Sequence, residues 1–482
     1  MSAAVGHDPG QVEGEEQTEL KRAIGPRLLL LFIVGDILGT GVYALTGKVA
    51  QEGGGAAWAP FLVAFAIALV TAFSYLELVT KYPRAAGAAL YTHKAFGIHF
   101  VTFLVAFTVM CSGITSASTA SKAFAANLAD GFGLDPANTN LVLGIALGFM
   151  LVVAAVNFRG VGESVKANVV LTCVELSGLL LVILVGIYAA TGGNADFSRV
   201  TVFDTSADKS VFLAITAATS LAFFAMVGFE DAVNMAEETH DPVRNFPRMM
   251  LAGLGITGVI YLLIAVFAVA LVPVGGLGEG DTPLTKVVTA GLPDFPVDVI
   301  MPFIAMFAVA NSALINMLMA SRLLYGMARQ DVLPPVLGWV HRGRRTPWVA
   351  IIFTTVIALG LITLVTKNSG SAVAALGGTT ALLLLGVFTI VNIAVLVLRR
   401  DPIDRAHFVT PTVLPVIGAV VCFFFTLPVT GRESIQYVIA GWLLVIGVGL
   451  WALTWAANRA FFGRKTYLRE PEELASEDAT KN

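Results

Sequence analysis

The stretch GDILGTGVY, from Gly35 to Tyr43, interrupts a hydrophobic segment with three glycines and one carboxylate. A second stretch, FFAMVGFEDAVNMAEE from Phe223 to Glu238, places Gly228 close to Glu230 and Asp231. Such residues do not suit a continuous lipid-facing helix, because a polar or charged group inside a membrane costs free energy unless it meets a partner. The two stretches therefore predict helices that are broken in the middle of a membrane.

The sequence around these stretches is strongly apolar: 56% of the 482 residues are hydrophobic and only 13% are charged. A helix needs about 20 mostly apolar residues to cross the hydrocarbon layer. We therefore predict an all-α integral membrane protein with twelve transmembrane helices. Their approximate spans are 27–50, 56–80, 98–129, 139–157, 164–191, 211–238, 247–273, 297–328, 346–366, 371–398, 411–428 and 434–461.

The two interrupted spans are the first and the sixth, so they lie five helices apart. This spacing fits two repeats of five helices, at about 27–191 and 211–398, followed by two more helices at about 411–461. Broken helices at corresponding places in two inverted repeats are typical of transporters, in which they meet at the membrane midplane. The spacing therefore predicts a transporter domain over 27–461 with a 5+5 inverted repeat.

The positive charges predict the orientation, because Lys and Arg are retained on the cytoplasmic side during insertion. With the N-terminus inside, most of the 30 lysines and arginines fall in cytoplasmic segments. The ends, 1–26 and 462–482, are acidic and poor in apolar residues, and we expect two cytoplasmic tails. No cleavage site follows the first span and no organelle signal is evident, so we expect a multi-pass plasma-membrane protein.

A broken helix offers two kinds of backbone partner to a ligand. Its exposed N–H groups and positive dipole end attract a carboxylate, and its freed carbonyls attract an ammonium or a metal cation. A site with both kinds of partner suits a zwitterion, and the commonest zwitterionic solute is an amino acid. The alternative is that the glycines serve only close helix packing, but the matching break in the sixth span argues against it.

Other classes of function find less support in the sequence. The three cysteines and six histidines have no metal-ligand spacing, so no metal, haem or other cofactor is indicated. A membrane-embedded enzyme would need a catalytic cluster, and a channel-like subunit would need polar residues along several helices. We expect the partners to be an amino acid, a coupling ion and the lipid bilayer, and no nucleic acid.

Five segments resemble the amino acid/polyamine/organocation (APC) superfamily, and most closely its cationic amino acid transporter branch. They are GDILGTGVY, SYLELVTKYPRAAGAALY, NFRGVGESVKAN, GFEDAVNMAEETHDPVRNFPR and SRLLYGMARQDVLP. The resemblance implies the LeuT-type fold, with a central site between the first, third, sixth, eighth and tenth helices. It also implies alternating access, in which groups of helices rock around that site.

The resemblance further implies which residues bind the substrate. The N–H groups that would receive its carboxylate belong to Gly39, Thr40 and Gly41. The carbonyls that would receive its ammonium belong to Ile37, Phe224, Ala225 and Val227. The ring of Phe224 would cover the substrate as an inner gate.

Glu175 lies in the middle of the fifth span, where an ionisable residue is a candidate functional group. Many proton-coupled relatives carry a lysine at this position, thought to stand in for a sodium ion, so the sign is reversed here. Glu175 either binds a transported proton, which we favour, or stays ionised and helps to hold a cation. The other expected coupling residues are Gly35, Asp36, Leu38, Asn311 and Ser312.

These observations predict a secondary active amino acid permease, coupled to protons. An exchanger or a sodium-coupled symporter remains the alternative. Asp36 would either orient the unwound backbone or share a proton with Glu175. Asp231 would favour basic substrates, unless it faces Arg322 or Lys122 in the folded bundle.

Overall fold

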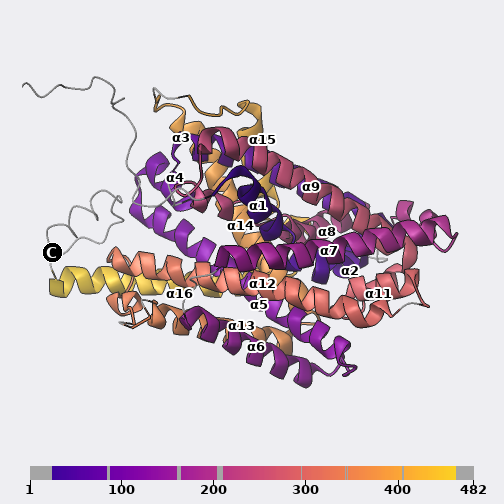
Figure 1. Cartoon of the computed structure of the whole chain (residues 1–482). Helices are drawn as coiled ribbons and strands as arrows, with labels where there is room; N and C mark the ends of the chain where they lie inside the picture. Colours follow the sequence, from indigo (N-terminus) through magenta and orange to yellow (C-terminus); the bar gives the residue numbers. More distant parts are fainter. Residues whose placement is uncertain are drawn as a thin grey trace, which may run out of the picture.

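The computed structural model describes residues 24–83, 87–159, 164–203, 210–294, 296–341, 343–344, 346–403 and 406–462. Its regular elements are helices, accompanied by one isolated parallel bridge between Ile24 and Thr239. The long helices run roughly along a common direction through one bundle (Figure 1). The predicted N-terminal tail lies almost entirely outside the described residues, and so does the predicted C-terminal tail.

The helices follow the predicted spans closely. Their bounds are α1 Pro26–Ile37, α2 Thr40–Gly53, α3 Trp58–Lys81, α4 Gly87–Phe96, α5 His99–Gly131, α6 Thr139–Arg159, α7 Ser164–Thr191, α8 Val211–Ala225, α9 Pro242–Leu271, α10 Val274–Gly278, α11 Pro283–Gly291, α12 Val297–Arg329, α13 Trp348–Asn368, α14 Ala372–Leu398, α15 Val413–Phe424 and α16 Ser434–Ala457. Ten helical stretches of the described chain are long and apolar enough to cross a membrane, with α1 and α2 counted as one. The shorter apolar helices α8 and α15 occupy the sixth and eleventh predicted spans. The chain is thus an all-α protein with many membrane-length helices.

The first predicted break lies between α1 and α2. The N–H of Leu38 still donates to the carbonyl of Val34, at 2.9 Å, and α1 then ends. Gly39, with φ −64° and ψ −145°, turns the backbone out of the helix, and α2 begins at Thr40. The interruption therefore falls inside GDILGTGVY, where the sequence predicts it.

The second break follows α8 and is wider than predicted. The backbone leaves the helix after Ala225 and passes through Gly228, whose φ of +126° favours glycine. The N–H of Gly228 donates to Oε2 of Glu230, at 2.9 Å. After this turn the chain forms a 3-10 helix, η3 (Asp231–Met235), so the prediction of α-helix up to residue 238 is wrong beyond Ala225. A nearby carboxylate offers the backbone a partner that competes with the helix.

Glycine allows the two broken segments to touch through their backbones. A Cβ atom on Gly41 would lie 2.3 Å from Cα of Ala225, and one on Gly228 would lie 2.7 Å from the carbonyl oxygen of Asp36. On the other side of the first break, a Cβ on Gly39 would lie 2.3 Å from Oγ of Ser312 in α12. These approaches leave no room for a side chain, so the glycines determine how closely the breaks approach.

Glu77 and Arg399 join the ends of α3 and α14. Nε and Nη2 of Arg399 donate to the two carboxylate oxygens of Glu77, at 2.8 and 2.7 Å, and the N–H of Thr410 donates to Oε2 at 2.8 Å. The Glu77 side chain is only 3% exposed, and its carboxylate raises the pKa of the Arg399 guanidinium. The contact therefore ties the segment that follows α14 to α3.

We predict that Gly41→Ala destabilises the protein, because the added methyl group overlaps the backbone of Ala225. Overpacking of this kind costs about 1–3 kcal/mol, which should lower the thermal unfolding midpoint of the detergent-solubilised protein by several degrees. The control is Gly144→Ala in α6, where no described atom outside the adjoining backbone of α6 lies within 4 Å of the added methyl group. Equal midpoints for the two variants would contradict the close approach of the breaks.

Candidate functional site

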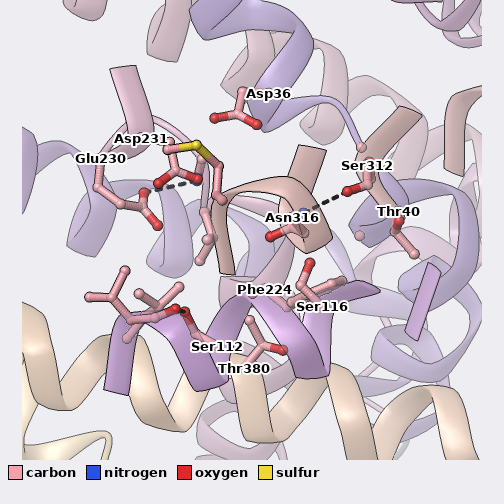
Figure 2. A pocket seen from close by; sticks show the side chains of 18 of the residues that line it. Asp36, Thr40, Ser112, Ser116, Phe224, Glu230, Asp231, Ser312, Asn316 and Thr380 are labelled. Atoms are coloured by element: carbon pink, nitrogen blue, oxygen red, sulfur yellow. Dashed lines mark hydrogen bonds between the residues drawn. The ribbon is translucent and has the colours of Figure 1, made fainter. Parts of the chain in front are cut away.

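A pocket lies between the two broken segments (Figure 2). Its wall is formed by the ends of α1 and α2, by α5, by the end of α8 and the turn after it, and by α12 and α14. These elements correspond to the first, third, sixth, eighth and tenth predicted spans. Helices that are distant in the sequence thus meet around one small polar space.

Most of the predicted substrate-binding residues line this pocket. The lining residues among them are Ile37, Gly39, Thr40, Gly41, Phe224 and Val227. Ala225 is not in the lining, but it contacts Gly41 directly behind it. Among the described residues, no side chain caps the start of α2 and none bonds to the buried hydroxyl of Thr40. The pocket therefore contains polar groups that a bound solute can satisfy.

The predicted coupling residues divide into two groups. Asp36 and Ser312 line the pocket, whereas Gly35, Leu38, Asn311 and Glu175 do not. Glu175 is fully buried in α7, and neither carboxylate oxygen accepts a hydrogen bond from a described residue. The first break lies beside it, because a Cβ on Gly35 would come within 2.0 Å of Oγ1 of Thr172, one turn before Glu175.

Two tyrosines that the sequence does not indicate as functional hold the backbone near the first break. Oη of Tyr261, in α9, donates to the carbonyl of Ile37 at 2.5 Å. Oη of Tyr43, in α2, donates to the backbone carbonyl of Glu175 at 2.6 Å. Both side chains are almost fully buried, and buried tyrosine hydroxyls usually bond to a partner. Tyr43 ends the stretch GDILGTGVY and Tyr261 lies in an apolar span, but neither position indicates which carbonyl the hydroxyl meets.

Serine, threonine and asparagine side chains supply a second polar wall. Ser112 and Ser116 on α5 face the pocket, as do Asn316 on α12 and Thr380 on α14 (Figure 2). Oγ1 of Thr380 lies 2.7 Å from Oγ1 of Thr115, and Nδ2 of Asn316 donates to the carbonyl of Ser312 at 2.8 Å. The Thr380–Thr115 contact links α14 to α5, whereas the Asn316 bond stays within α12.

The charged groups of the lining are all acidic. Asp36, Glu230 and Asp231 line the pocket, and none of its described lining residues is a lysine or an arginine. Figure 2 shows Glu230 and Asp231 together on one side, away from Thr40 on the other. The lining therefore favours a solute with positive charge near Glu230 and Asp231.

Lys122 and Arg322 do not neutralise these acids. Neither side chain lines the pocket, and no ion pair joins either of them to Asp231 within the described ranges. Lys122 instead interacts electrostatically with Asp281, in the loop between α10 and α11. Burial raises the pKa of Asp281, and the charges of Lys48 and Lys122 oppose that rise.

A second, smaller cavity adjoins the pocket at its acidic side. Glu230 and Asp231 line both cavities, and Tyr75, Gly87 and Asn234 line only the second. Gly87 begins α4 and Asn234 lies in η3, so this cavity extends toward the end of the bundle where Ile24 bonds to Glu238. The acid pair thus lies between the pocket and that end of the protein.

Comparison with known proteins identifies the family of this fold. The model of a family described as amino acid permease matches residues 24–451. The chain belongs to the amino acid permease family. This permease is 27% identical to the methylthioribose transporter of Bacillus subtilis over 88% of its own length and 92% of the relative's. It is 23% identical to a branched-chain amino acid permease of the same organism, over 89% and 92% of the two lengths. A vacuolar cationic amino acid transporter of Arabidopsis thaliana is 28% identical over 82% of this permease and 62% of the relative.

We predict that Tyr261→Phe weakens substrate binding by the permease, because the Ile37 carbonyl loses the hydroxyl that fixes its direction. One neutral hydrogen bond contributes about 0.5–1.5 kcal/mol, so the KM of uptake should rise by roughly 2- to 10-fold. The measurement is initial uptake by reconstituted protein over a range of substrate concentrations. Tyr437→Phe, whose hydroxyl bonds to the Thr426 carbonyl away from the pocket, is the matched control. An unchanged KM in Tyr261→Phe would exclude this role.

Proposed function

We propose that this permease moves amino acids across the plasma membrane by alternating access, as a secondary active transporter. The observation that carries the proposal is the polar pocket formed by two interrupted helices inside an apolar bundle. Unwound backbone is tolerated at membrane depth where it lines a cavity or meets a ligand. A pocket with backbone donors on one side and acceptors on the other suits a zwitterion.

In this proposal the two breaks bind opposite ends of the amino acid. The N–H groups of Gly39, Thr40 and Gly41 receive its carboxylate at the positive end of α2, where no side chain competes for them. The carbonyls of Phe224, Ala225 and Val227 receive its ammonium, together with that of Ile37. The Ile37 carbonyl has a second lone pair for this purpose, because Tyr261 uses only one.

We propose that the bundle has the LeuT-type 5+5 arrangement. The first repeat is the broken α1–α2 helix through α7, and the second is the broken segment from α8 through α14. Counting α8 and α15 as membrane spans gives the twelve spans expected from the sequence. An even number of spans leaves both termini on one side, which we propose to be the cytoplasm. The ring of Phe224 is the inner gate over the substrate.

The acidic lining favours amino acids that carry a positive side chain. Three carboxylates face the pocket without a described basic residue in its wall, so a second positive charge on the substrate reduces their mutual repulsion. The substrate ammonium lies at the breaks, and its side chain then extends toward Glu230 and Asp231. The relatives do not share one substrate, since their names include methylthioribose and branched-chain amino acids.

Glu175 is the proposed coupling group, and the proposed ion is a proton. Its carboxylate lies at membrane depth with no hydrogen-bond donor and no basic residue bonded to it among the described residues. Burying such a group as an ion is costly, and a bound proton removes the charge. Sodium is the alternative ion, held by Glu175 with oxygens of Gly35, Leu38, Asn311 and Ser312, and an exchanger would use neither gradient.

Uptake by purified permease in proteoliposomes tests the function. We expect accumulation of labelled lysine and arginine to exceed that of aspartate and glutamate by at least about tenfold, equivalent to ~1.4 kcal/mol. Gradients of pH and of sodium are imposed separately, and accumulation should follow the pH gradient. If none of the twenty common amino acids is taken up, the proposed function is wrong. Preference for the acidic ones would contradict only the role of the pocket carboxylates.

We predict that Glu175→Gln loses accumulation driven by a pH gradient, by at least about tenfold, because an amide cannot bind and release the proton. Exchange of labelled for unlabelled amino acid should continue in this variant. The control is Ser177→Ala, two residues further along α7, whose hydroxyl is exposed and bonds only within its own helix. Wild-type accumulation in Glu175→Gln would remove Glu175 from the coupling mechanism.

A further inference from the structure

Two carboxylates near the first break differ in their access to the pocket. Asp36 lines the pocket, and its Oδ2 atom is buried without a hydrogen-bond partner in the part of the chain that the structure describes. Glu175 is 0% exposed and absent from the lining, and both of its carboxylate oxygens lack a partner in the described chain. Asp36 is therefore in contact with the pocket, whereas Glu175 is not.

The two carboxylates belong to segments in direct contact. Gly35, the residue before Asp36, packs against Thr172, one turn from Glu175 on α7. Tyr43, from the other side of the break, bonds to the backbone of Glu175 at 2.6 Å. The contact of Gly35 with Thr172 places Asp36 and Glu175 on adjoining segments, where two ionised carboxylates repel each other. Asp36 is therefore a carboxylate that both lines the pocket and interacts with Glu175.

Neither of the two nearby tyrosines has an O–H left to donate to the carboxylate of Asp36 or Glu175. A phenol carries one O–H, and Tyr43 and Tyr261 donate theirs to backbone carbonyls. The other charged groups that face Asp36 are Glu230 and Asp231, both acidic. No described lysine or arginine forms an ion pair with Asp36 or Glu175. Among the described residues, a hydrogen bond between these two carboxyl groups therefore requires a proton bound to one of them.

We propose that Asp36 is the proton relay of this permease, receiving a proton from the pocket and passing it to Glu175. The inference rests on the proposed function, because it assumes that Glu175 is the coupling group. In the transfer an O–H bond of Asp36 breaks and an O–H bond of Glu175 forms. During the transfer the two carboxyl groups together hold one proton and one negative charge. This state is favoured because two ionised carboxylates would repel each other.

This arrangement gives the proton a way in through the substrate pocket. Asp36 faces the same space as the proposed ammonium-binding carbonyls, so a bound substrate and a proton on Asp36 affect each other electrostatically. Glu175 is not part of the pocket lining and does not face the substrate. Asp36 thereby acts as a positioning and relay group rather than as part of the carboxylate-binding end of the site.

The test compares coupling with exchange in the same proteoliposomes. The probe is a ¹⁴C-labelled mixture of the twenty common amino acids, and the coupling ratio is accumulation driven by a pH gradient divided by the rate of exchange. We expect Asp36→Asn to lower this ratio at least about tenfold, as Glu175→Gln does, and the double variant to lower it no further, because both act in one path. Asp36→Glu keeps a carboxyl group and should retain most of the ratio.

The matched control is Asp135→Asn, which removes an exposed carboxylate from the loop between α5 and α6, outside the pocket. Its coupling ratio should stay within about twofold of the wild-type ratio. A wild-type ratio in Asp36→Asn, together with a reduced ratio in Glu175→Gln, would overturn the relay and leave the proposed function intact. Wild-type ratios in both variants would overturn the coupling role of Glu175 as well.

A second measurement uses the wild-type chain and does not depend on the folding of a variant. A hydrophobic carbodiimide reacts with protonated carboxyl groups, and mass spectrometry locates the product. We expect labelling of Asp36 to abolish amino acid-driven proton influx, followed with a pH-sensitive dye inside the vesicles. Influx that persists when Asp36 is fully labelled would overturn the relay.

Discussion

The structure depends on backbone contact between two interrupted helices. Gly41 touches Ala225, and Gly228 touches the carbonyl of Asp36, so the segment between α1 and α2 and the segment after α8 meet without intervening side chains. This contact brings helix ends, which carry backbone groups without helical partners, to the same place in the bundle. The pocket, its polar lining and its three acids all follow from that meeting.

The sequence predicted the features that are encoded locally. The lengths of the apolar stretches predicted the helices, and the glycines next to acidic residues predicted where both breaks lie. The turn after α8 was harder to predict, because the carboxylate of Glu230 captures the N–H of Gly228 and η3 replaces the α-helix. Hydropathy contains no information about that competition. The short helices α4, α10 and α11 likewise lie outside what spans of membrane length can reveal.

Contacts between distant residues were beyond the reach of sequence patterns. Tyr261 meets Ile37 across 224 positions, and this contact depends on how α9 is rotated against α1. The same limit applies to Glu175, since its place in the apolar span was evident but its separation from the pocket was not. A linear sequence gives the depth of a residue in the membrane more readily than the direction in which its side chain points.

The ion pair between Glu77 and Arg399 has a mechanical consequence. Glu77 is buried and Arg399 is partly exposed, so separating them leaves the buried carboxylate without its charged partner and without two of its N–H donors. The adjoining ends of α3 and α14 are therefore expected to travel as one rigid unit. We therefore expect any bending of the bundle at the places where helical hydrogen bonds are already interrupted, at Leu38–Gly39 and after Ala225. These two places would then act as hinges.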